Sequence, residues 1–118
     1  MRAWQPARRR RSSCFPDPVT FANRHQIIDF ANSQRVPVVS GWADFAEAGA
    51  LFTYGPRLRE SYRRLAYYVD RILKGEKPGE LPIERPTVFE VVINLKTAKA
   101  LGIEVQPALI ARADRVIE

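Results

Sequence analysis

Residues 87–102 read TVFEVVINLKTAKALG, and this stretch decides the fold class of the chain. Its first half, 87–94, is rich in β-branched and aromatic residues, which favour a strand. Asn94 suits the N-cap of a helix, because its side chain can accept a hydrogen bond from the first turn. Gly102 suits the other end of that helix, where a left-handed residue often ends the last turn. The stretch therefore predicts a strand that passes directly into a helix at 95–101.

The same alternation of strand and helix extends to both sides of this stretch. Further strands are predicted at 36–40 and at 50–54, where Gly55 and Pro56 end the second one. Helices are predicted at 18–34, at 43–48 and from Pro107 onward, the last with Leu109, Ile110, Ala113 and Val116 on one side. Strands separated by helices indicate an α/β fold with parallel pairing. Three strands make a small sheet, since about four to six are usual, so the chain resembles part of a larger domain.

Residues 57–74 give the clearest helical pattern in the sequence. Apolar side chains recur there at steps of three and four, at Leu58, Tyr62, Leu65, Val69 and Ile72. The other faces carry mostly charged side chains, and Gly75 follows as a stop. We therefore expect this helix to cover a core with one face only.

Basic charge is concentrated at the N-terminus. The first 14 residues carry five arginines and no acid, whereas the rest of the chain has 14 basic and 13 acidic side chains. No apolar segment of the secretory type follows the arginine run. We expect residues 1–15 to form a disordered basic tail and residues 16–118 to form the folded part. Phosphate binding by arginines 8–11 is an alternative, but acids dilute the basic surface of helix 57–74, so nucleic acid is the less favoured partner.

The sequence has no pattern typical of a catalytic or metal centre. Its six glycines form neither a phosphate-binding loop nor a dinucleotide fingerprint. One cysteine and one histidine leave no cluster of metal ligands and no nucleophile–base pair. Asp44 and Glu47 stand one helical turn apart, but acids at that spacing are common on solvated surfaces. We therefore expect a protein without catalytic residues, metal or cofactor.

Four residues are better suited to bind a small molecule. Ligands of α/β sheets usually lie beyond the carboxyl ends of the parallel strands. Trp42, Tyr54 and Gly55 hold such positions, and Asp17 would join them if a strand preceded it. Flat aromatic faces, and a carboxylate that can pair with an ammonium group, suit a small amphipathic solute. The alternative is that Trp42 and Tyr54 are packing residues at the rim of the core.

Several longer motifs resemble one known family. The most specific are residues 45–49 (FAEAG), 54–56 (YGP), 68–75 (YVDRILKG), 89–102 (FEVVINLKTAKALG) and 112–114 (RAD). With Asp17, Pro18 and the helix that follows, they resemble the C-terminal part of substrate-binding proteins of ABC transporters. The group is the tryptophan/tyrosine type, within the type I periplasmic-binding-protein fold. The resemblance covers residues 16–118.

The resemblance implies a binding protein with two α/β lobes. Such proteins trap a small solute, such as an amino acid, in the cleft between the lobes and then contact an ABC permease. It also implies that Asp17, Trp42, Tyr54 and Gly55 line that cleft, outside the cytoplasm. The first lobe has no counterpart in this chain, so we expect a partial lobe with a short parallel sheet flanked by helices. A truncated product, or a start assigned too late, would explain the shortness.

The missing lobe leaves two further expectations open. If Met1 is the true start, no export signal is encoded and the chain stays in the cytoplasm. An enclosing surface of one lobe only is expected to bind solute weakly. The alternative function is a self-associating module without ligand, because surfaces that a first lobe would cover favour homo-oligomers.

Overall fold

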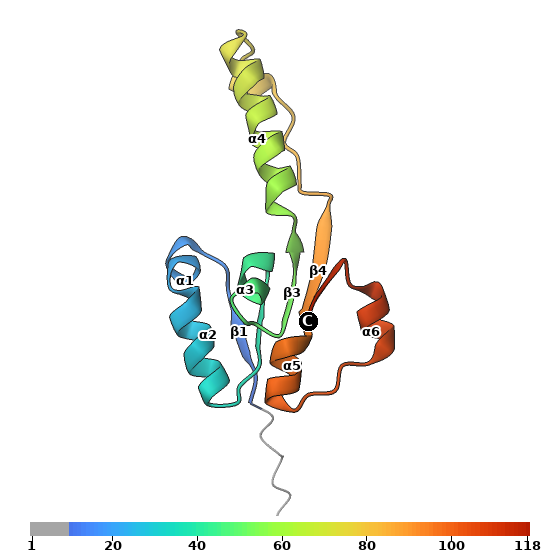
Figure 1. The fold of residues 1–118 in the computed structure, drawn as a ribbon. Coiled ribbons are helices and arrows are strands. Elements are labelled where there is room, and N and C mark those ends of the chain that lie inside the picture. The colour runs from blue at the N-terminus through green and yellow to red at the C-terminus, as the bar shows by residue number, and fades with distance from the viewer. Residues whose placement is uncertain (1–9) are drawn as a thin grey trace, which may run out of the picture.

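The computed structural model describes residues 10–118, which form a body and an arm (Figure 1). The body is a sheet with helices, made by residues 10–56 and 89–118. The arm is a helix and its return segment, residues 57–88, which project from one edge of the body. The described part of the chain is therefore elongated.

The body is organised around a five-stranded sheet in the order β1-β2-β3-β4-β5. Its strands are β1 (Ser12–Cys14), β2 (Val38–Ser40), β3 (Phe52–Pro56), β4 (Phe89–Asn94) and β5 (Arg115–Ile117). Neighbouring strands are parallel except for β3 and β4, which are antiparallel. The expected α/β class with a mostly parallel sheet is confirmed, but uniform parallel pairing is wrong. The chain leaves β3 into the arm and returns at the same edge of the sheet, which is the connection that antiparallel strands allow.

The apolar cluster described next lies on one face of this sheet, and Ile93 of β4 is buried on the other. The helices of the body are α1 (Pro18–Ala22), α2 (Arg24–Ser33), α3 (Ala43–Glu47), α5 (Leu95–Leu101) and α6 (Pro107–Arg112). Ile28 of α2, Val38 of β2 and Phe45 of α3 are fully buried and belong to one apolar cluster. Because side chains alternate along a strand, Tyr54 projects from the face opposite to its buried neighbour Thr53.

The passage from β4 into α5 is confirmed at Asn94 and Gly102. The Asn94 Oδ1 accepts a hydrogen bond from the Thr97 N–H at 2.9 Å, which caps the helix. Gly102 ends the helix with φ of 68°. Asn94 is buried, and its Nδ2 also donates to the carbonyl oxygen of Ala46 at 2.9 Å, so one side chain joins α5 to α3.

A strand precedes Asp17, contrary to the expected tail. Residues 12–14 form β1 and pair with residues 38–40 of β2. Cys14 is buried in the core cluster, and this burial raises the pKa of its thiol. A disordered tail over all of residues 1–15 is therefore wrong at its C-terminal end, and residues 1–9 lie outside the described part of the chain.

Three other boundaries differ from the sequence-based prediction. The helix expected over 18–34 divides at Asn23, whose side chain donates to the Val19 carbonyl oxygen at 2.9 Å. Gly55 and Pro56 lie inside β3 rather than after it. The last helix ends at Arg112, and Val116 belongs to β5, where it pairs with Ile93 of β4. At Val116, the backbone hydrogen bonds available along the free side of β4 outweigh the helical spacing of the apolar side chains.

The arm contains α4 (Leu58–Leu73) and a short 3₁₀ turn, η1 (Pro78–Glu80). The helix forms where the spacing predicts it, but its expected role is wrong. Of its 16 residues, none is buried by the part of the chain that the structure describes. Within residues 10–118, the apolar face of α4 thus covers no core.

Candidate functional site

Three loops meet at the carboxyl edge of β1, β2 and β3. The Ser40 hydroxyl donates to the Cys14 carbonyl oxygen at 2.8 Å, which joins the ends of β1 and β2. A Cβ atom on Gly41 would lie 3.0 Å from Cγ of Pro16. These contacts bring the Asp17 loop, the Trp42 loop and the end of β3 to one place, as the sequence predicts for strands that share an edge.

Gly55 allows the closest of these contacts. A Cβ atom there would lie only 1.9 Å from the carbonyl oxygen of Gly41. No side chain fits in that space, because the neighbour is rigid backbone. Gly55 therefore shapes the candidate site by letting the β2 loop lie against β3, and it offers no side chain to a ligand.

Asp17 is held by its own helix. Its Oδ1 accepts hydrogen bonds from the backbone N–H groups of Val19 at 2.7 Å and Thr20 at 3.0 Å. The Thr20 hydroxyl oxygen accepts from the Asp17 N–H at 3.0 Å, which completes a capping box. Both bonds to the carboxylate fall on Oδ1, and a carboxylate has room for about four hydrogen bonds. Asp17 thus has a fixed orientation at the edge of the sheet.

Trp42 packs toward the core side of the sheet. Its ring meets the Phe21 ring edge-on, with 5.6 Å between centroids and 69° between planes. The Phe21 ring also meets the ring of Phe45, a residue of the core cluster, with 6.3 Å between centroids. The packing role that the sequence left open for Trp42 is therefore real, since the residue is partly buried against that cluster.

Tyr54 lies at the same edge but on the other face of the sheet. It is 57% exposed and stacks on Phe89, which is 45% exposed, with 5.7 Å between centroids and 25° between planes. Tyr54 faces Val91 across the antiparallel pair, so Phe89 is its diagonal neighbour on that face. The two rings form an exposed aromatic platform, which we call the Tyr54–Phe89 stack.

The family to which the chain belongs follows from comparison with known proteins. A family model described as ABC transporter substrate binding protein matches residues 14–117. The chain belongs to this family. Curated proteins, by contrast, give no match.

Several solved structures share the fold. A conserved domain protein from Vibrio cholerae is 28% identical, with a TM-score of 0.86 over 90% of this chain and 36% of its own. An ABC domain in complex with L-Trp from Streptococcus pneumoniae is 22% identical, with a TM-score of 0.81 over 89% of this chain and 36% of its own. A substrate binding protein with adhesive properties from Clostridium difficile, in a ligand-free, open structure, is also 22% identical. Its TM-score is 0.58 over 91% of this chain and 36% of that chain.

The chain spans little more than a third of the length of these similar structures, 36% in each. Within residues 10–118, no helix is both long and apolar enough to cross a membrane. The same residues contain no group of three metal-ligating side chains.

Sequence reasoning missed Phe89 as a candidate site residue. The sequence places Phe89 in the predicted strand at 87–94, but it does not predict the antiparallel pairing that sets Phe89 beside Tyr54. A signal was present, because Phe89 and Tyr54 both flank the arm in the sequence. Tyr54 and Phe89 become neighbours because the chain re-enters the sheet beside the point at which it leaves for the arm.

Proposed function

We propose that this chain forms part of the solute site of an ABC uptake system. The solute would be a small amphipathic molecule such as an amino acid, captured outside the cytoplasm and delivered to an ABC permease. The observation that carries the proposal is the exposed Tyr54–Phe89 stack at the carboxyl edge of the sheet. Two aromatic rings that remain exposed at such an edge suit an aromatic or apolar group of a ligand better than a polar one.

Two kinds of contact support an amino acid as the solute. An aromatic or aliphatic side chain would lie on the Tyr54 and Phe89 rings. An ammonium group would pair with the Asp17 carboxylate, whose two cap hydrogen bonds both fall on Oδ1. The complex of the Streptococcus pneumoniae relative with L-Trp is consistent with a solute of this class. Trp42 would act from the core side by holding its loop in place.

The proposal involves binding and no chemical step. The residues at the edge are an aspartate whose Oδ1 caps a helix, two stacked rings and glycine backbone. They offer contact area and one charge, which suits capture and release. Substrate-binding proteins as a family are binders, in agreement with this assignment.

The test is a titration of the chain with L-tryptophan, followed by amide NMR. We expect chemical-shift changes confined to the residues around Asp17, Tyr54 and Phe89. The platform encloses a solute from one side only, so the expected dissociation constant is about 1 mM or weaker, about −4 kcal/mol. A micromolar constant would contradict this one-sided geometry.

Two variants sharpen the titration. Tyr54→Ala should abolish the shift changes, because it removes one half of the stack. Tyr62→Ala is the matched control, since Tyr62 is also an exposed tyrosine but lies on the arm, and its loss should leave the changes intact. Equal effects of both variants, or shifts that cluster on the arm, would refute the proposed site.

A further inference from the structure

Arg57 lies where the arm leaves the body, and its side chain contacts two carboxylates of the body. Its Nε lies 3.6 Å from Oε2 of Glu90 on β4, and its Nη2 lies 3.9 Å from Oδ1 of Asp114, just before β5. These three residues come from segments far apart in the sequence, and we call them the Arg57 clasp. Only 19% of the Glu90 side chain is exposed, so its charge is costly to leave without a cation.

Asp114 is fixed to β4 by two hydrogen bonds. Its Oδ2 accepts from the Val91 N–H at 2.8 Å, and its own N–H donates to the Val91 carbonyl oxygen at 2.9 Å. One carboxylate oxygen is therefore bound to the backbone of β4, and the other is the one nearer to Arg57. Asp114 ends the RAD motif at 112–114, which has no place among the solute-binding residues described above. It gives the Arg57 guanidinium a carboxylate in a fixed position.

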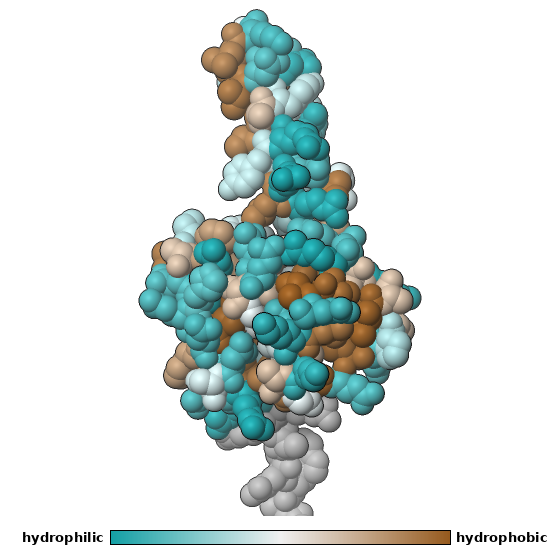
Figure 2. All heavy atoms as spheres, in the orientation of Figure 1, coloured by the Kyte–Doolittle hydropathy of each residue, from teal (hydrophilic) through white to brown (hydrophobic). Residues whose placement is uncertain are grey.

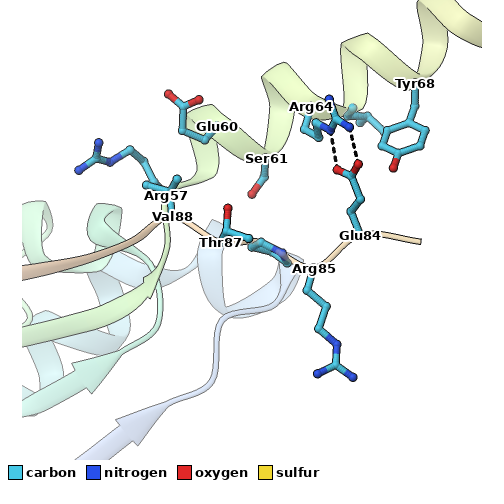
Figure 3. Close-up of a pocket in the computed structure, with 11 residues that line it drawn as sticks. Arg57, Glu60, Ser61, Arg64, Tyr68, Glu84, Arg85, Thr87 and Val88 are labelled. Carbon is cyan, nitrogen blue, oxygen red and sulfur yellow. Dashed lines mark hydrogen bonds and ion pairs between the residues drawn. The ribbon is translucent and has the colours of Figure 1, made fainter. Parts of the chain in front are cut away.

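The Arg57 clasp holds β4 on both sides of Phe89. On the side of the arm, the Val88 carbonyl oxygen accepts the Arg57 N–H at 3.0 Å, and Figure 3 shows Val88 next to Arg57 at the start of α4. On the side of the body, Glu90 pairs with the Arg57 side chain. Phe89 is thus enclosed in sequence by two residues that the same arginine contacts.

The Arg57 clasp and the Tyr54–Phe89 stack lie on opposite faces of the same two strands. Glu90 is opposite Gly55 in the antiparallel pair and follows Phe89 directly, so its side chain projects from the face away from the stack. Figure 2 shows that the arm is narrow where it meets the body, so each contact at this junction strongly affects how the strand ends are held. The clasp therefore ties β3 to β4 from behind the two rings.

We propose that Arg57 and Asp114 are positioning residues for the solute site, because the Arg57 clasp keeps Phe89 against Tyr54. Without the clasp, the ends of β3 and β4 can separate at the junction, and the Phe89 ring moves away with β4. Two rings fixed before the solute arrives lower the entropy cost of binding. The inference rests on the proposed function for the identity of the site, but its first measurement needs no solute.

That first measurement is the contact between the two rings in the absence of solute. Nuclear Overhauser effects between ring protons of Tyr54 and Phe89 are compared in the parent and in two variants, Arg57→Gln and Asp114→Asn. Partly exposed ion pairs are weak, so the intensities should fall by about two- to fivefold. Unchanged intensities in Arg57→Gln would overturn the proposal.

The choice of variants separates positioning from general stability. Asp114→Asn keeps an oxygen that can accept the Val91 N–H, so it removes the charge and retains the hydrogen bond. Arg63→Gln is the matched control, because it breaks an ion pair with Glu60 inside α4 and should leave the ring contacts intact. A role in stability alone would lower the unfolding temperature of Arg57→Gln and leave the ring contacts of the folded protein unchanged, which contradicts the proposal.

The second measurement repeats the titration with L-tryptophan on the same variants. The affinity should fall by about two- to fivefold in Arg57→Gln and stay unchanged in Arg63→Gln. Loosened rings with an unchanged affinity would overturn the positioning role. If the parent itself shows no shift changes with L-tryptophan, the proposed function fails, and the ring contacts alone then decide whether the Arg57 clasp orders the stack.

Discussion

The body and the arm of this protein use the same kind of amphipathic helix in opposite ways. In the body, α2 is ten residues long and buries Ile28 and Ala31 against the sheet. In the arm, α4 has 16 residues and the more regular apolar spacing, yet its apolar side chains remain exposed. The difference teaches that an amphipathic pattern identifies which face is apolar, while the rest of the fold decides what covers that face. The body supplies its own core, whereas no residue of α4 is buried by the described residues 10–118.

The largest effect should come from the centre of the body. Phe45→Ala should lower the free energy of unfolding by about 3–5 kcal/mol, because it empties a fully buried ring site. Leu65→Ala on the arm should change it by less than about 0.5 kcal/mol, since that side chain is exposed. Urea denaturation followed by circular dichroism measures both. Similar losses of unfolding free energy in the two variants would contradict the proposed difference between body and arm.

The next effect concerns the backbone contact at the edge of the sheet. Gly55→Ala should cost about 3 kcal/mol, because its Cβ would overlap the Gly41 carbonyl oxygen. Gly79→Ala in the arm has nothing within 4 Å of the added Cβ and should be close to neutral. Thermal unfolding of the two variants compares them directly. A Gly55→Ala protein as stable as the parent would mean that the two loops separate without cost.

A smaller loss is expected from the cap of the first helix. Asp17→Ala removes the acceptor of two backbone hydrogen bonds and should cost about 1 kcal/mol. The same measurement on Asp17→Asn should show much less loss, because asparagine also caps helices. If solute binding in the NMR titration falls for both variants while only Asp17→Ala is destabilised, the carboxylate charge has a second role.

The smallest effect belongs to the arm and depends on pH. Hydrogen bonds from Arg64 hold the pKa of the Glu84 carboxyl below its usual range. A depressed pKa favours the folded state above the ordinary range of glutamate, and this contribution is lost as the pH falls through the lowered value. NMR titration of the Glu84 carboxyl should show its midpoint return to the ordinary range in Arg64→Gln. An unchanged midpoint would show that Arg64 is not the cause.

Much of the fold could be predicted because local signals and tertiary contacts agree there. Asn94 and Gly102 end α5 by chemistry that lies within the helix itself. The prediction fails at segments whose structure depends on pairing with a strand far away in the sequence. The segment 12–14 is short and mostly polar, so only pairing with β2 makes it a strand. Val116 has helical spacing but joins the open edge of β4.

The sequence predicts where the candidate site lies, but it predicts fewer of the contacts within the site. The carboxyl ends of the predicted strands place Trp42 and Tyr54 at one edge of the sheet, and Asp17 joins them if a strand precedes it. The sequence does not show that Trp42 and Tyr54 point to opposite faces, because that depends on the register of β2 and β3. Phe89 was hidden for the same reason, since its place beside Tyr54 requires the antiparallel pairing of β3 and β4.

The way in which the arm joins the body has a consequence for how such a sequence can change. Pro56 and Phe89 face each other as paired residues, and just beyond them the Arg57 N–H donates to the Val88 carbonyl oxygen at 3.0 Å. Everything between these two points is therefore an insertion whose ends already touch. A turn of a few residues would also join the end of β3 to the start of β4. The arm can therefore be lengthened, exchanged or removed while the strands keep their order in the sheet.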